Sequence, residues 1–337
     1  MRWSPGLNLL TGENGSGKTN ILEGINIISG WGPLDRGTKT LSIPSWNSGS
    51  TEVQLTGELE SSEIIKVKIS RRYAIRIDDK ASSASELRWK IPVLTFLPDD
   101  MSIVEGSSVF RRRLLDMVLA LIIPPYAMRL SEYRRGVRQK ALFLKRGMPS
   151  MIADRALLPL ASWIWRMREE GVALLADSLG GFEQLAPFGI GLSLKRGGAG
   201  FERDCADDYA KALVVNGERE RAMRFPVVGP HRDDIIITSQ SRPASSALSR
   251  GLRRRTAMAL MLAASESVRR KLGREPVLLL DEVAAELDPA GKEQLFSTLH
   301  ARGGQIFAAT AEPISPAVPC AVYRISSGKI DKIEEKV

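Results

Sequence analysis

The feature that most constrains this chain is the stretch 7–23, which reads LNLLTGENGSGKTNILE. Within it, Gly12, Gly17, Lys18 and Thr19 match the spacing G-x-x-x-x-G-K-[ST]. A short apolar run precedes the glycines, and apolar residues at helical spacing follow them. The order is therefore strand, glycine-rich turn and helix, which is the context in which this spacing predicts a P-loop.

A P-loop binds the phosphates of a nucleotide for physical reasons that depend on these residue types. Glycines let the backbone pass close to phosphate oxygens, and the N–H groups of the turn and the first helical turn point at the anion. We expect Lys18 to reach the β- and γ-phosphates and the Thr19 hydroxyl to bind Mg²⁺. The competing interpretation is a glycine-rich turn with an unrelated lysine, which the strand–turn–helix order disfavours.

Length and charge narrow the class of protein. The chain has 337 residues, 43% of them hydrophobic, which is enough for a large core and suggests about two domains. Its formal net charge of +9 is typical of a protein that meets nucleic acid or an anionic membrane surface, although solubility alone would also explain it.

Cysteine usage and apolar runs predict a cytoplasmic protein. Cys205 and Cys320 are far apart and lack a C-x-x-C partner, so the sequence indicates neither a disulfide framework nor a zinc knuckle. His231 has no second ligand at metal spacing, and we interpret it as structural. The longest apolar run, 117–123, is too short to span a bilayer, and residues 1–5 show no signal-peptide pattern.

The segments after the P-loop show both strand and helix periodicities. Residues 52–79 alternate between apolar and polar, which predicts a meander of antiparallel strands, and residues 91–97 read as a buried strand. From about residue 109 to 194 the pattern is mostly helical. The clearest helices are predicted at 126–143, 156–179 and 252–272.

The predicted helical region is strongly basic and has few acidic neighbours in sequence. Its basic residues are Arg129, Arg134, Arg135, Arg138, Lys140, Lys145 and Arg146. Either this is an ordinary solvated helix face, or it is a surface that meets an anion. Under the second interpretation, the first candidates for DNA contact are Arg134, Arg135, Arg138 and Lys140.

A second strong signal lies at 277–282, where apolar residues end in Asp281 and Glu282. This pattern indicates a buried parallel strand whose C-terminal end carries carboxylates, and α/β sheets bind their ligands at that end. We expect Asp281 to help hold Mg²⁺ and Glu282 to orient or deprotonate an attacking water. A buried strand that merely ends in acidic residues is the competing interpretation.

The distance along the chain between Lys18 and Asp281 is much longer than a minimal P-loop core needs. We therefore predict an α/β domain formed by residues 1–100 and 225–337, with residues 101–224 inserted as a mainly helical lobe. The insert lacks sustained heptads and contains internal proline and glycine, so we expect a compact lobe, not a coiled-coil arm.

Four motifs then occur in a known order: the P-loop, Ser-Arg-Gly at a predicted helix start, the apolar-Asp-Glu strand, and Glu-Leu-Asp. Together they resemble the ABC-type ATPase head, in the version of the SMC, RecN and RecF proteins. Over nearly its full length the chain resembles the RecF family. The supporting segments are GENGSGKTNILE at 12–23, FLPDDMSIVEG and RRRLLD within 96–116, GPHRDD at 229–234, ALSRG at 247–251 and LLLDEVAAELD at 278–288.

The resemblance implies a mixed-sheet ATPase head and a set of site residues. Lys18, Asp281 and Glu282 would be catalytic, and Thr19 and Asp281 would bind Mg²⁺. Ser249 and Gly251 would belong to a signature motif that contacts ATP held by the opposite subunit. Asp288 would be the D-loop residue, and Thr310 would occupy the position of the switch histidine. The P-loop residues that would bind ATP are Gly12, Glu13, Asn14, Gly15, Ser16, Gly17, Lys18, Thr19 and Asn20.

The resemblance also implies an activity and partners. The family binds double-stranded DNA when ATP dimerises it, and it works with RecO and RecR to load RecA at single-strand gaps. The resemblance further implies that the protein is a slow, DNA-stimulated ATPase, and that it is associated with the nucleoid and not with a membrane. One departure from the family pattern is Leu252, which stands where the signature motif usually continues with glutamine.

Three alternatives stay open at this stage. The chain could be a scaffold that binds ATP and DNA with negligible turnover, and Leu252 favours this reading. It could be another SMC-like repair ATPase. The third alternative, the nucleotide-binding subunit of a transporter, is disfavoured by the basic lobe and by Thr310 in place of a switch histidine.

Overall fold

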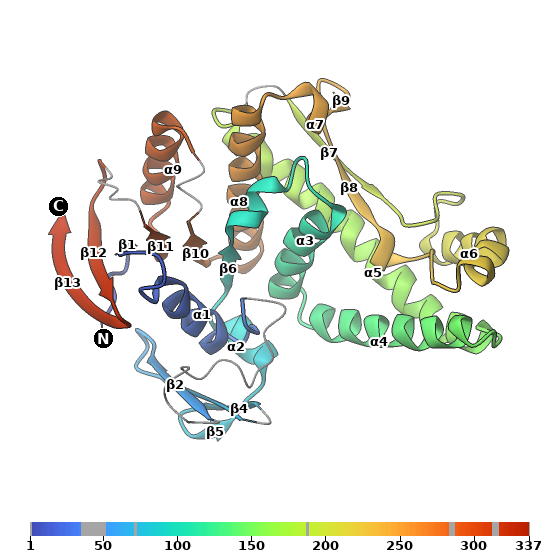
Figure 1. Cartoon of the computed structure of the whole chain (residues 1–337), viewed down its shortest axis with the longest axis horizontal. Helices are drawn as coiled ribbons and strands as arrows, with labels where there is room; N and C mark the ends of the chain where they lie inside the picture. The colour runs from blue at the N-terminus through green and yellow to red at the C-terminus, as the bar shows by residue number, and fades with distance from the viewer. Residues whose placement is uncertain are drawn as a thin grey trace. The chain divides into compact units, whose positions relative to one another are not determined.

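The structure is a computed structural model, and it divides the chain into two units (Figure 1). Unit 1 comprises residues 1–98 and 272–337, and unit 2 comprises residues 99–271. The residues that the structure describes are 2–34, 52–70, 73–186, 189–282, 287–311 and 317–336. Glu286 of the Glu-Leu-Asp motif lies outside them.

The larger sheet of unit 1 has the strand order β13-β12-β1-β11-β10-β6. Neighbouring strands from β12 through β1, β11 and β10 to β6 are all parallel. Strand β13 is antiparallel to β12, so the sheet is mixed. The bounds of its strands are β1 (Leu7–Thr11), β6 (Val93–Phe96), β10 (Val277–Asp281), β11 (Ile306–Thr310), β12 (Cys320–Ser326) and β13 (Lys329–Lys336). The predicted strands β1, β6 and β10 are confirmed, whereas β12 and β13 were not predicted.

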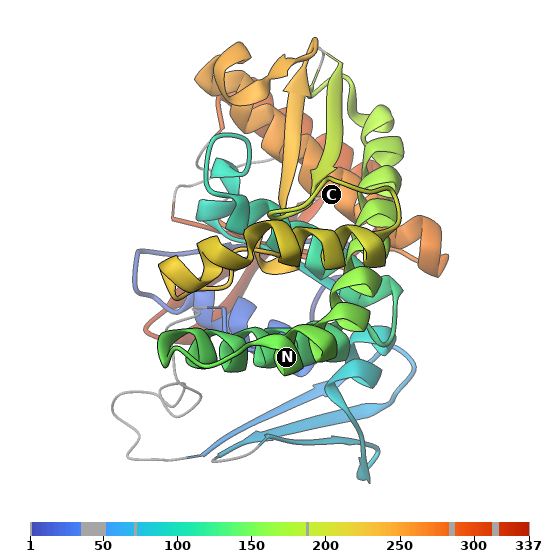
Figure 2. The same cartoon turned by 90° about the vertical axis from the view of Figure 1, so that its right-hand side faces the viewer.

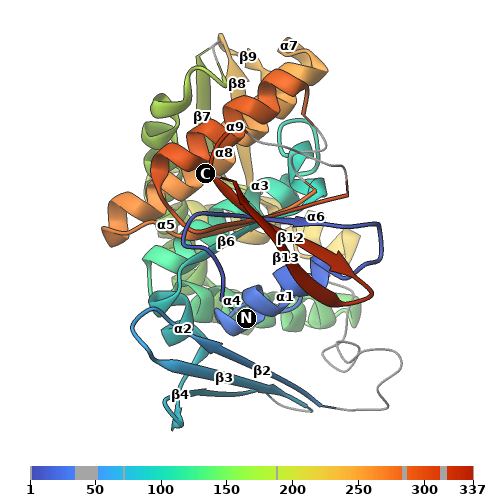
Figure 3. The same cartoon turned by 90° about the vertical axis from the view of Figure 1, so that its left-hand side faces the viewer.

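Helices lie on both faces of this sheet. The helix α1 (Lys18–Ile28) packs Leu22 into a cluster with Leu10, Leu279 and Phe307 of the central strands. Figure 3 shows α9 (Pro289–Arg302) on the other side of the sheet from α1.

Unit 1 also contains a four-stranded antiparallel sheet in the order β2-β3-β4-β5. Its strands pair in register, which confirms the predicted meander. Apolar side chains such as Val67 face a cluster that also includes Leu87 of the short helix α2 (Ala84–Lys90). The strand bounds are β2 (Val53–Glu58), β3 (Ile64–Ile69), β4 (Tyr73–Ile77) and β5 (Lys80–Ala81).

Unit 2 is mainly helical. Its long helix α5 packs against both α4 and α6, and Figure 2 shows this part of the unit. The helix bounds are α3 (Ser108–Ile122), α4 (Tyr126–Lys145), α5 (Met151–Leu179), α6 (Cys205–Met223), α7 (Ala244–Ala247) and α8 (Arg250–Leu272). Short 3₁₀ turns are η2 (Pro98–Ser102), η3 (Gly180–Phe182) and η4 (Pro230–Arg232), and an antiparallel sheet is formed by β7 (Ile190–Lys195), β8 (Asp234–Ser239) and β9 (Arg242–Pro243).

The division in the structure differs from the predicted boundary at residue 224, because residues 225–271 lie in unit 2. The boundary differs because residues 225–271 contact distant segments of unit 2, and a local sequence pattern does not reveal such contacts. Strand β8 pairs along its length with β7, and the Ser267 hydroxyl of α8 lies 3.0 Å from the Ser178 hydroxyl of α5.

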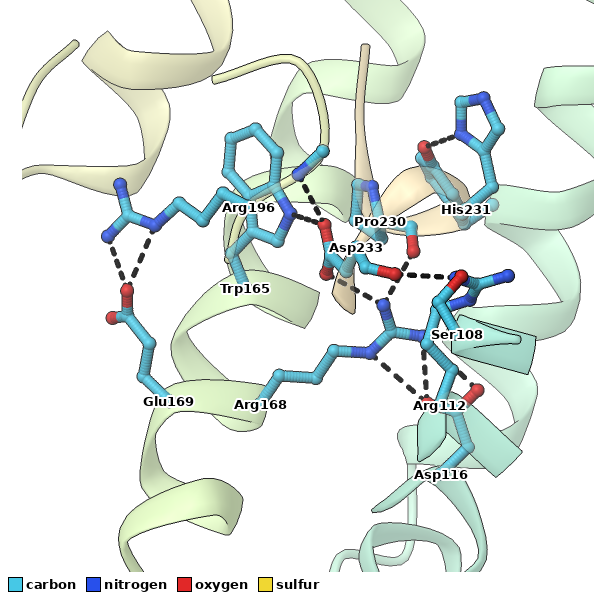
Figure 4. A network of polar contacts seen from close by, with 12 residues as sticks. Ser108, Arg112, Asp116, Trp165, Arg168, Glu169, Arg196, Pro230, His231 and Asp233 are labelled. Atoms are coloured by element: carbon cyan, nitrogen blue, oxygen red, sulfur yellow. Dashed lines mark hydrogen bonds and ion pairs between the residues drawn. The ribbon is translucent and has the colours of Figure 1, made fainter. Parts of the chain in front are cut away.

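A buried network of charged side chains organises the interior of unit 2 (Figure 4). The Arg168 guanidinium is 2% exposed and donates to Asp233 Oδ2 at 2.7 Å, to Asp116 Oδ1 at 2.9 Å and to the Pro230 carbonyl at 2.6 Å. The Trp165 indole N–H donates to the other Asp233 oxygen at 2.9 Å. Burial raises the pKa of Asp233, and the charge of Arg168 opposes this shift.

This network connects two of the segments that carry the family resemblance. Asp116 ends the segment RRRLLD and Asp233 belongs to GPHRDD. Arg111 of the first segment also forms an ion pair with Asp234 of the second, with Nε 2.7 Å from Oδ1. The two segments therefore hold each other inside unit 2.

His231 is part of the same region and has the structural role that we predicted. Its Nδ1 lies 2.8 Å from the Tyr133 hydroxyl, and its Nε2 lies 3.1 Å from the Pro226 carbonyl oxygen. Burial lowers the pKa of His231 to about 4, so the ring is neutral at physiological pH.

We expect Arg168→Leu to destabilise the protein by about 3–5 kcal/mol, because it removes the buried cation of Asp233 and leaves Asp116 paired with the exposed Arg134. Urea denaturation measures the loss. The matched control is Arg134→Leu, which removes a pair to the same Asp116 from a side chain that is 58% exposed. It should cost less than about 1 kcal/mol, and equal losses in both variants would contradict the structural role of burial.

Candidate nucleotide-binding site

The predicted site residues of unit 1 meet at one edge of the large sheet. Strands β1, β11 and β10 are parallel neighbours, with Thr11 beside Thr310 and Asp281 beside Ala309. Their C-terminal ends therefore bring the P-loop, Asp281 and Thr310 to a common edge, which is where open α/β sheets bind ligands.

Two of the predicted P-loop glycines are required by the shape of the turn. Gly12 has φ +155°, and a Cβ there would lie 2.3 Å from the carbonyl oxygen of Ile325. Gly17 has φ +110° and caps the N-terminus of α1. The described helix α1 has no side-chain cap and no acidic residue in its first turn, which leaves its N-terminal N–H groups suited to an anion.

Lys18 lies across this loop and is only 5% exposed. Its Nζ donates to the carbonyl oxygens of Gly12 at 2.7 Å and Glu13 at 3.1 Å. The same atom lies 3.5 Å from Glu282 Oε1. The lysine and the carboxylate that the sequence placed in one site are thus neighbours.

Thr19 and Asp281 also meet as predicted. The Thr19 hydroxyl lies 3.0 Å from Asp281 Oδ2 and 3.3 Å from Oδ1. Burial raises the pKa of Asp281, and the hydrogen bond from Thr19 opposes the shift. A buried carboxylate with a raised pKa beside a hydroxyl is an environment that a cation would stabilise.

Glu282 has an unusual backbone conformation, with φ +51°. Its N–H donates to the Ala309 carbonyl at 3.0 Å, and its Oε2 accepts from the N–H of Ala311 at 3.1 Å. A left-handed conformation at a residue other than glycine is costly and recurs at functional sites. Here the bond to Ala309 fixes the Glu282 backbone, and the bond from Ala311 sets the direction of the Glu282 carboxylate.

The other predicted P-loop positions differ in exposure. Glu13, Asn14, Gly15 and Asn20 are exposed. The Ser16 hydroxyl oxygen is buried, and within the described part of the chain no hydrogen-bond partner is found for it.

Asp288 and Thr310 occupy different surroundings. Asp288 is exposed and caps α9 by accepting from the Gly291 N–H at 2.9 Å. Thr310 is the last residue of β11 and is 1% exposed.

The predicted signature residues Ser249 and Gly251 belong to unit 2 and start α8. Both are exposed, and the Ser249 hydroxyl accepts from the Leu252 N–H at 3.4 Å, as an N-cap side chain does. A Cβ at Gly251 would meet no atom within 4 Å, so the space next to this glycine is open.

The predicted DNA-contacting residues of α4 do not form one surface. Arg134, Arg135 and Arg138 are exposed. Lys140 corrects the prediction, because it is 1% exposed and its Nζ lies 2.5 Å from Glu220 and 2.7 Å from Asp154. These acidic partners come from α6 and α5, so the local sequence around α4 did not reveal them.

The β12–β13 hairpin adjoins the P-loop and was not predicted from the sequence. The Gly328 N–H donates to the Ser16 carbonyl at 2.9 Å, and the Thr11 hydroxyl donates to the Tyr323 carbonyl at 3.3 Å. Alternating apolar residues from Cys320 onward, followed by Ser-Ser-Gly, are the strand and turn signals that could have located it.

Two general properties of the chain follow from the described residues. No cluster of three or more His, Cys, Asp or Glu side chains in the described ranges could hold a metal ion by itself. None of the helices in that part of the chain has the length and apolar character that a membrane span requires.

Comparison with known proteins gives consistent matches over nearly the whole chain. The family model for the RecF/RecN/SMC N terminal domain matches residues 1–315. The DNA replication and repair protein RecF of Heliobacterium modesticaldum is 30% identical over an alignment that covers 98% of this chain and 94% of that protein.

Solved structures show the same fold. The chain is similar to the recombination mediator protein RecF-ATPrS in the RecFOR pathway, with a TM-score of 0.86 and 23% identity, covering 99% of this chain and 94% of that one. It is also similar to RecF-ATP of the same pathway, with a TM-score of 0.83 and 22% identity, covering 99% and 93%.

We expect Asp281→Asn to stabilise the protein in the absence of nucleotide. Because the pKa of Asp281 is raised in the folded state, its ionisation costs stability, and this cost grows as the pH rises from the ordinary range of an aspartate through the raised pKa. Asparagine carries no charge, so the variant should have a higher Tm than wild type at pH 7, and the gain should vanish as the pH falls below the ordinary range of an aspartate.

The control for this prediction is Asp79→Asn, also in unit 1. The hydrogen bond from Lys66 lowers the pKa of the exposed Asp79. The charged form of Asp79 therefore favours folding, opposite to that of Asp281, and Asp79→Asn should gain no stability at pH 7. Thermal unfolding from pH 3 to pH 8 tests both variants. A Tm for Asp281→Asn at or below that of wild type at pH 7 would refute the assigned cost of the buried charge.

Proposed function

The chain belongs to the RecF family of DNA replication and repair proteins, and from this premise we propose that it is an ATP-dependent, dimerising DNA-binding protein of recombinational repair. The observation that carries the proposal is the meeting of Lys18, Thr19, Asp281 and Glu282 at one sheet edge. We infer that ATP is the nucleotide, since RecF-ATP is among the similar structures.

The residues around the P-loop fit a nucleotide with Mg²⁺. Lys18 would transfer its donors from the loop carbonyls to the β- and γ-phosphates. Thr19 and Asp281 would hold Mg²⁺. Adjacent ligands in an octahedral Mg²⁺ shell lie about 3 Å apart, and the Thr19 and Asp281 oxygens already lie 3.0 Å apart. Bound Mg²⁺ would neutralise negative charge on the phosphate oxygens.

Glu282 is the residue we assign to the attacking water. Its carboxylate follows the Mg²⁺ residue Asp281 directly and is 27% exposed, so solvent reaches it. The bond from the Ala311 N–H holds one oxygen and aims the group. Glu282 would orient the water and accept its proton. Thr310 occupies the position of the switch histidine at the same sheet edge. In that role it would respond to the presence of the γ-phosphate.

We propose that two subunits share each site. Ser249 and Gly251 are exposed at the start of α8, where N–H groups of a helix N-terminus favour an anion. They would contact the γ-phosphate of ATP held by the partner subunit, and exposed Asp288 would lie in the same interface. ATP would thus join the dimer and its hydrolysis would release it.

The dimer would bind double-stranded and gapped DNA mainly through phosphates. The net charge of +9 and the exposed Arg134, Arg135 and Arg138 support this part of the proposal. Membership of the RecF family suggests the biological role of this binding. With RecR and RecO, the protein would promote loading of RecA at single-strand gaps. The alternative, a scaffold that binds ATP and DNA with negligible turnover, is favoured by Leu252 in the signature motif.

The shared site predicts that hydrolysis depends on protein concentration. The rate per subunit should rise with concentration and rise again with duplex DNA. Glu282→Gln should bind ATP and form a dimer that persists on DNA, because the water would no longer be activated. Concentration-dependent dimerisation without turnover in the wild type would favour the scaffold, and a rate that is flat in both tests would remove the shared site.

A mixing experiment isolates the role of Ser249. Lys18→Ala and Ser249→Arg should each abolish hydrolysis, but their mixture should recover roughly a quarter of the wild-type rate, because half the dimers are mixed and each has one intact site. The controls are the two separate variants at the same total concentration. No recovery on mixing would mean that Ser249 acts within its own subunit or not at all.

DNA binding should depend on the exposed arginines of α4. The double variant Arg135→Gln/Arg138→Gln should weaken binding to duplex and lower the slope of log K against log salt by about 2. The charge-matched control is Lys66→Gln/Lys68→Gln on strand β3, at side chains that are 38% and 52% exposed. Equal losses in the two double variants would attribute binding to net charge and not to α4.

A further inference from the structure

The C-terminal hairpin β12–β13 forms one wall of the P-loop. Three residues between the end of β1 and the start of α1 contact it: the Thr11 hydroxyl donates to the Tyr323 carbonyl, Gly12 lies against the Ile325 carbonyl, and the Ser16 carbonyl accepts from the Gly328 N–H. Figure 3 shows the turn of this hairpin near the start of α1. On the side of the hairpin, all three contacts are made by backbone groups, so they depend on the path of the hairpin more than on its side chains.

One P-loop glycine owes its fit to this wall. A Cβ at Gly12 would come within 2.3 Å of the Ile325 carbonyl oxygen, whereas a Cβ at Gly17 would lie 3.5 Å from the Gly328 Cα, which is an ordinary van der Waals contact. Backbone atoms of a paired strand such as β12 cannot move aside as the end of a flexible side chain can. The first glycine of the motif is therefore required by the hairpin as well as by the phosphates that the motif is expected to bind.

The hydrogen bond from Gly328 sets the direction of a phosphate-binding N–H. The peptide unit between Ser16 and Gly17 is planar and trans, so its C=O and N–H point in opposite directions. Because the Ser16 C=O accepts from Gly328 at 2.9 Å, the Gly17 N–H points away from the hairpin. A flip of this peptide would turn the Gly17 N–H toward the hairpin and break the bond.

The turn that supplies this donor has a backbone shape that glycine favours. The hairpin has a two-residue loop, Ser327 and Gly328, between the paired Ser326 and Lys329. Both loop residues have positive φ, +48° and +76°, as a type I′ turn requires. A β-branched residue at position 328 would disfavour this conformation and displace the N–H.

We propose that Gly328 is a positioning residue for nucleotide binding: its N–H fixes the Ser16–Gly17 peptide so that the Gly17 N–H can meet a phosphate. The inference rests on the proposed function, since it concerns the same P-loop. It assigns to the C-terminal hairpin, far from the motif in sequence, a direct effect on affinity for the nucleotide. In this role Gly328 would act through the Ser16–Gly17 peptide and not through contact with the nucleotide.

The test compares ATP affinity between matched glycine variants. Gly328→Val should raise the Kd for a fluorescent ATP analogue with Mg²⁺ by about fivefold to tenfold, the effect of losing one hydrogen bond that orders the loop. The control is Gly303→Val. Gly303 has nearly the same φ, +72°, and the same open surroundings, but it caps α9 and does not contact the P-loop. It should lower the Tm to a similar extent and leave the Kd unchanged.

Two further variants keep the test decisive. Gly328→Asn, which tolerates positive φ, should retain most of the affinity. Gly328→Ala is a milder change in the same direction, for use if the valine variant does not fold. Equal Kd values for Gly328→Ala, Gly303→Ala and wild type would overturn the proposal, and so would equal losses at positions 328 and 303.

The design separates this proposal from the function on which it rests. If wild-type protein fails to bind the analogue, or if Lys18→Ala binds it as tightly as wild type, the proposed nucleotide site is wrong. If wild type binds, Lys18→Ala does not, and Gly328→Val binds like wild type, the nucleotide site stands and the role of the hairpin is refuted.

Discussion

The parallel pairing of β1 with β11 and β12, and of β11 with β10, is the constraint on which the site of unit 1 depends. Strand β1 comes from the start of the chain, and its neighbours come from the last quarter of it. Because parallel strands end at the same edge, this one arrangement places Lys18 beside Glu282 and Thr19 beside Asp281. The site therefore forms only after the two ends of the chain have paired.

Unit 2 depends on a different kind of interaction. Its interior contains Arg168 between Asp116 and Asp233, and Lys140 between Asp154 and Glu220. Buried ion pairs of this kind contribute less to net stability than their number suggests, but removal of one partner is costly. They specify which helices meet, and they remove Lys140 from the surface on which its sequence neighbours Arg135 and Arg138 remain.

Much of the secondary structure was predictable because it has local causes. The P-loop and the strand before it, the antiparallel meander, the helices α4 and α8 and the Asp281–Glu282 strand each have a pattern within a short window. The failures share a physical reason, which is that their cause lies far away in sequence. Residues 225–271 join unit 2 because β8 pairs with β7, and no local pattern contains that choice of partner.

The sequence by itself determined the chemistry of the proposed site: glycines where positive φ and close approach are required, a lysine and threonine at a helix start, and two carboxylates at a strand end. These are properties of residue type and spacing, so they can be recognised without knowing which distant segments come into contact. Only the tertiary structure decided which basic residues are exposed and which are buried in ion pairs, and that a C-terminal hairpin forms a wall of the P-loop. Such features depend on contacts between segments that are distant in sequence, and burial and backbone direction are set by those contacts.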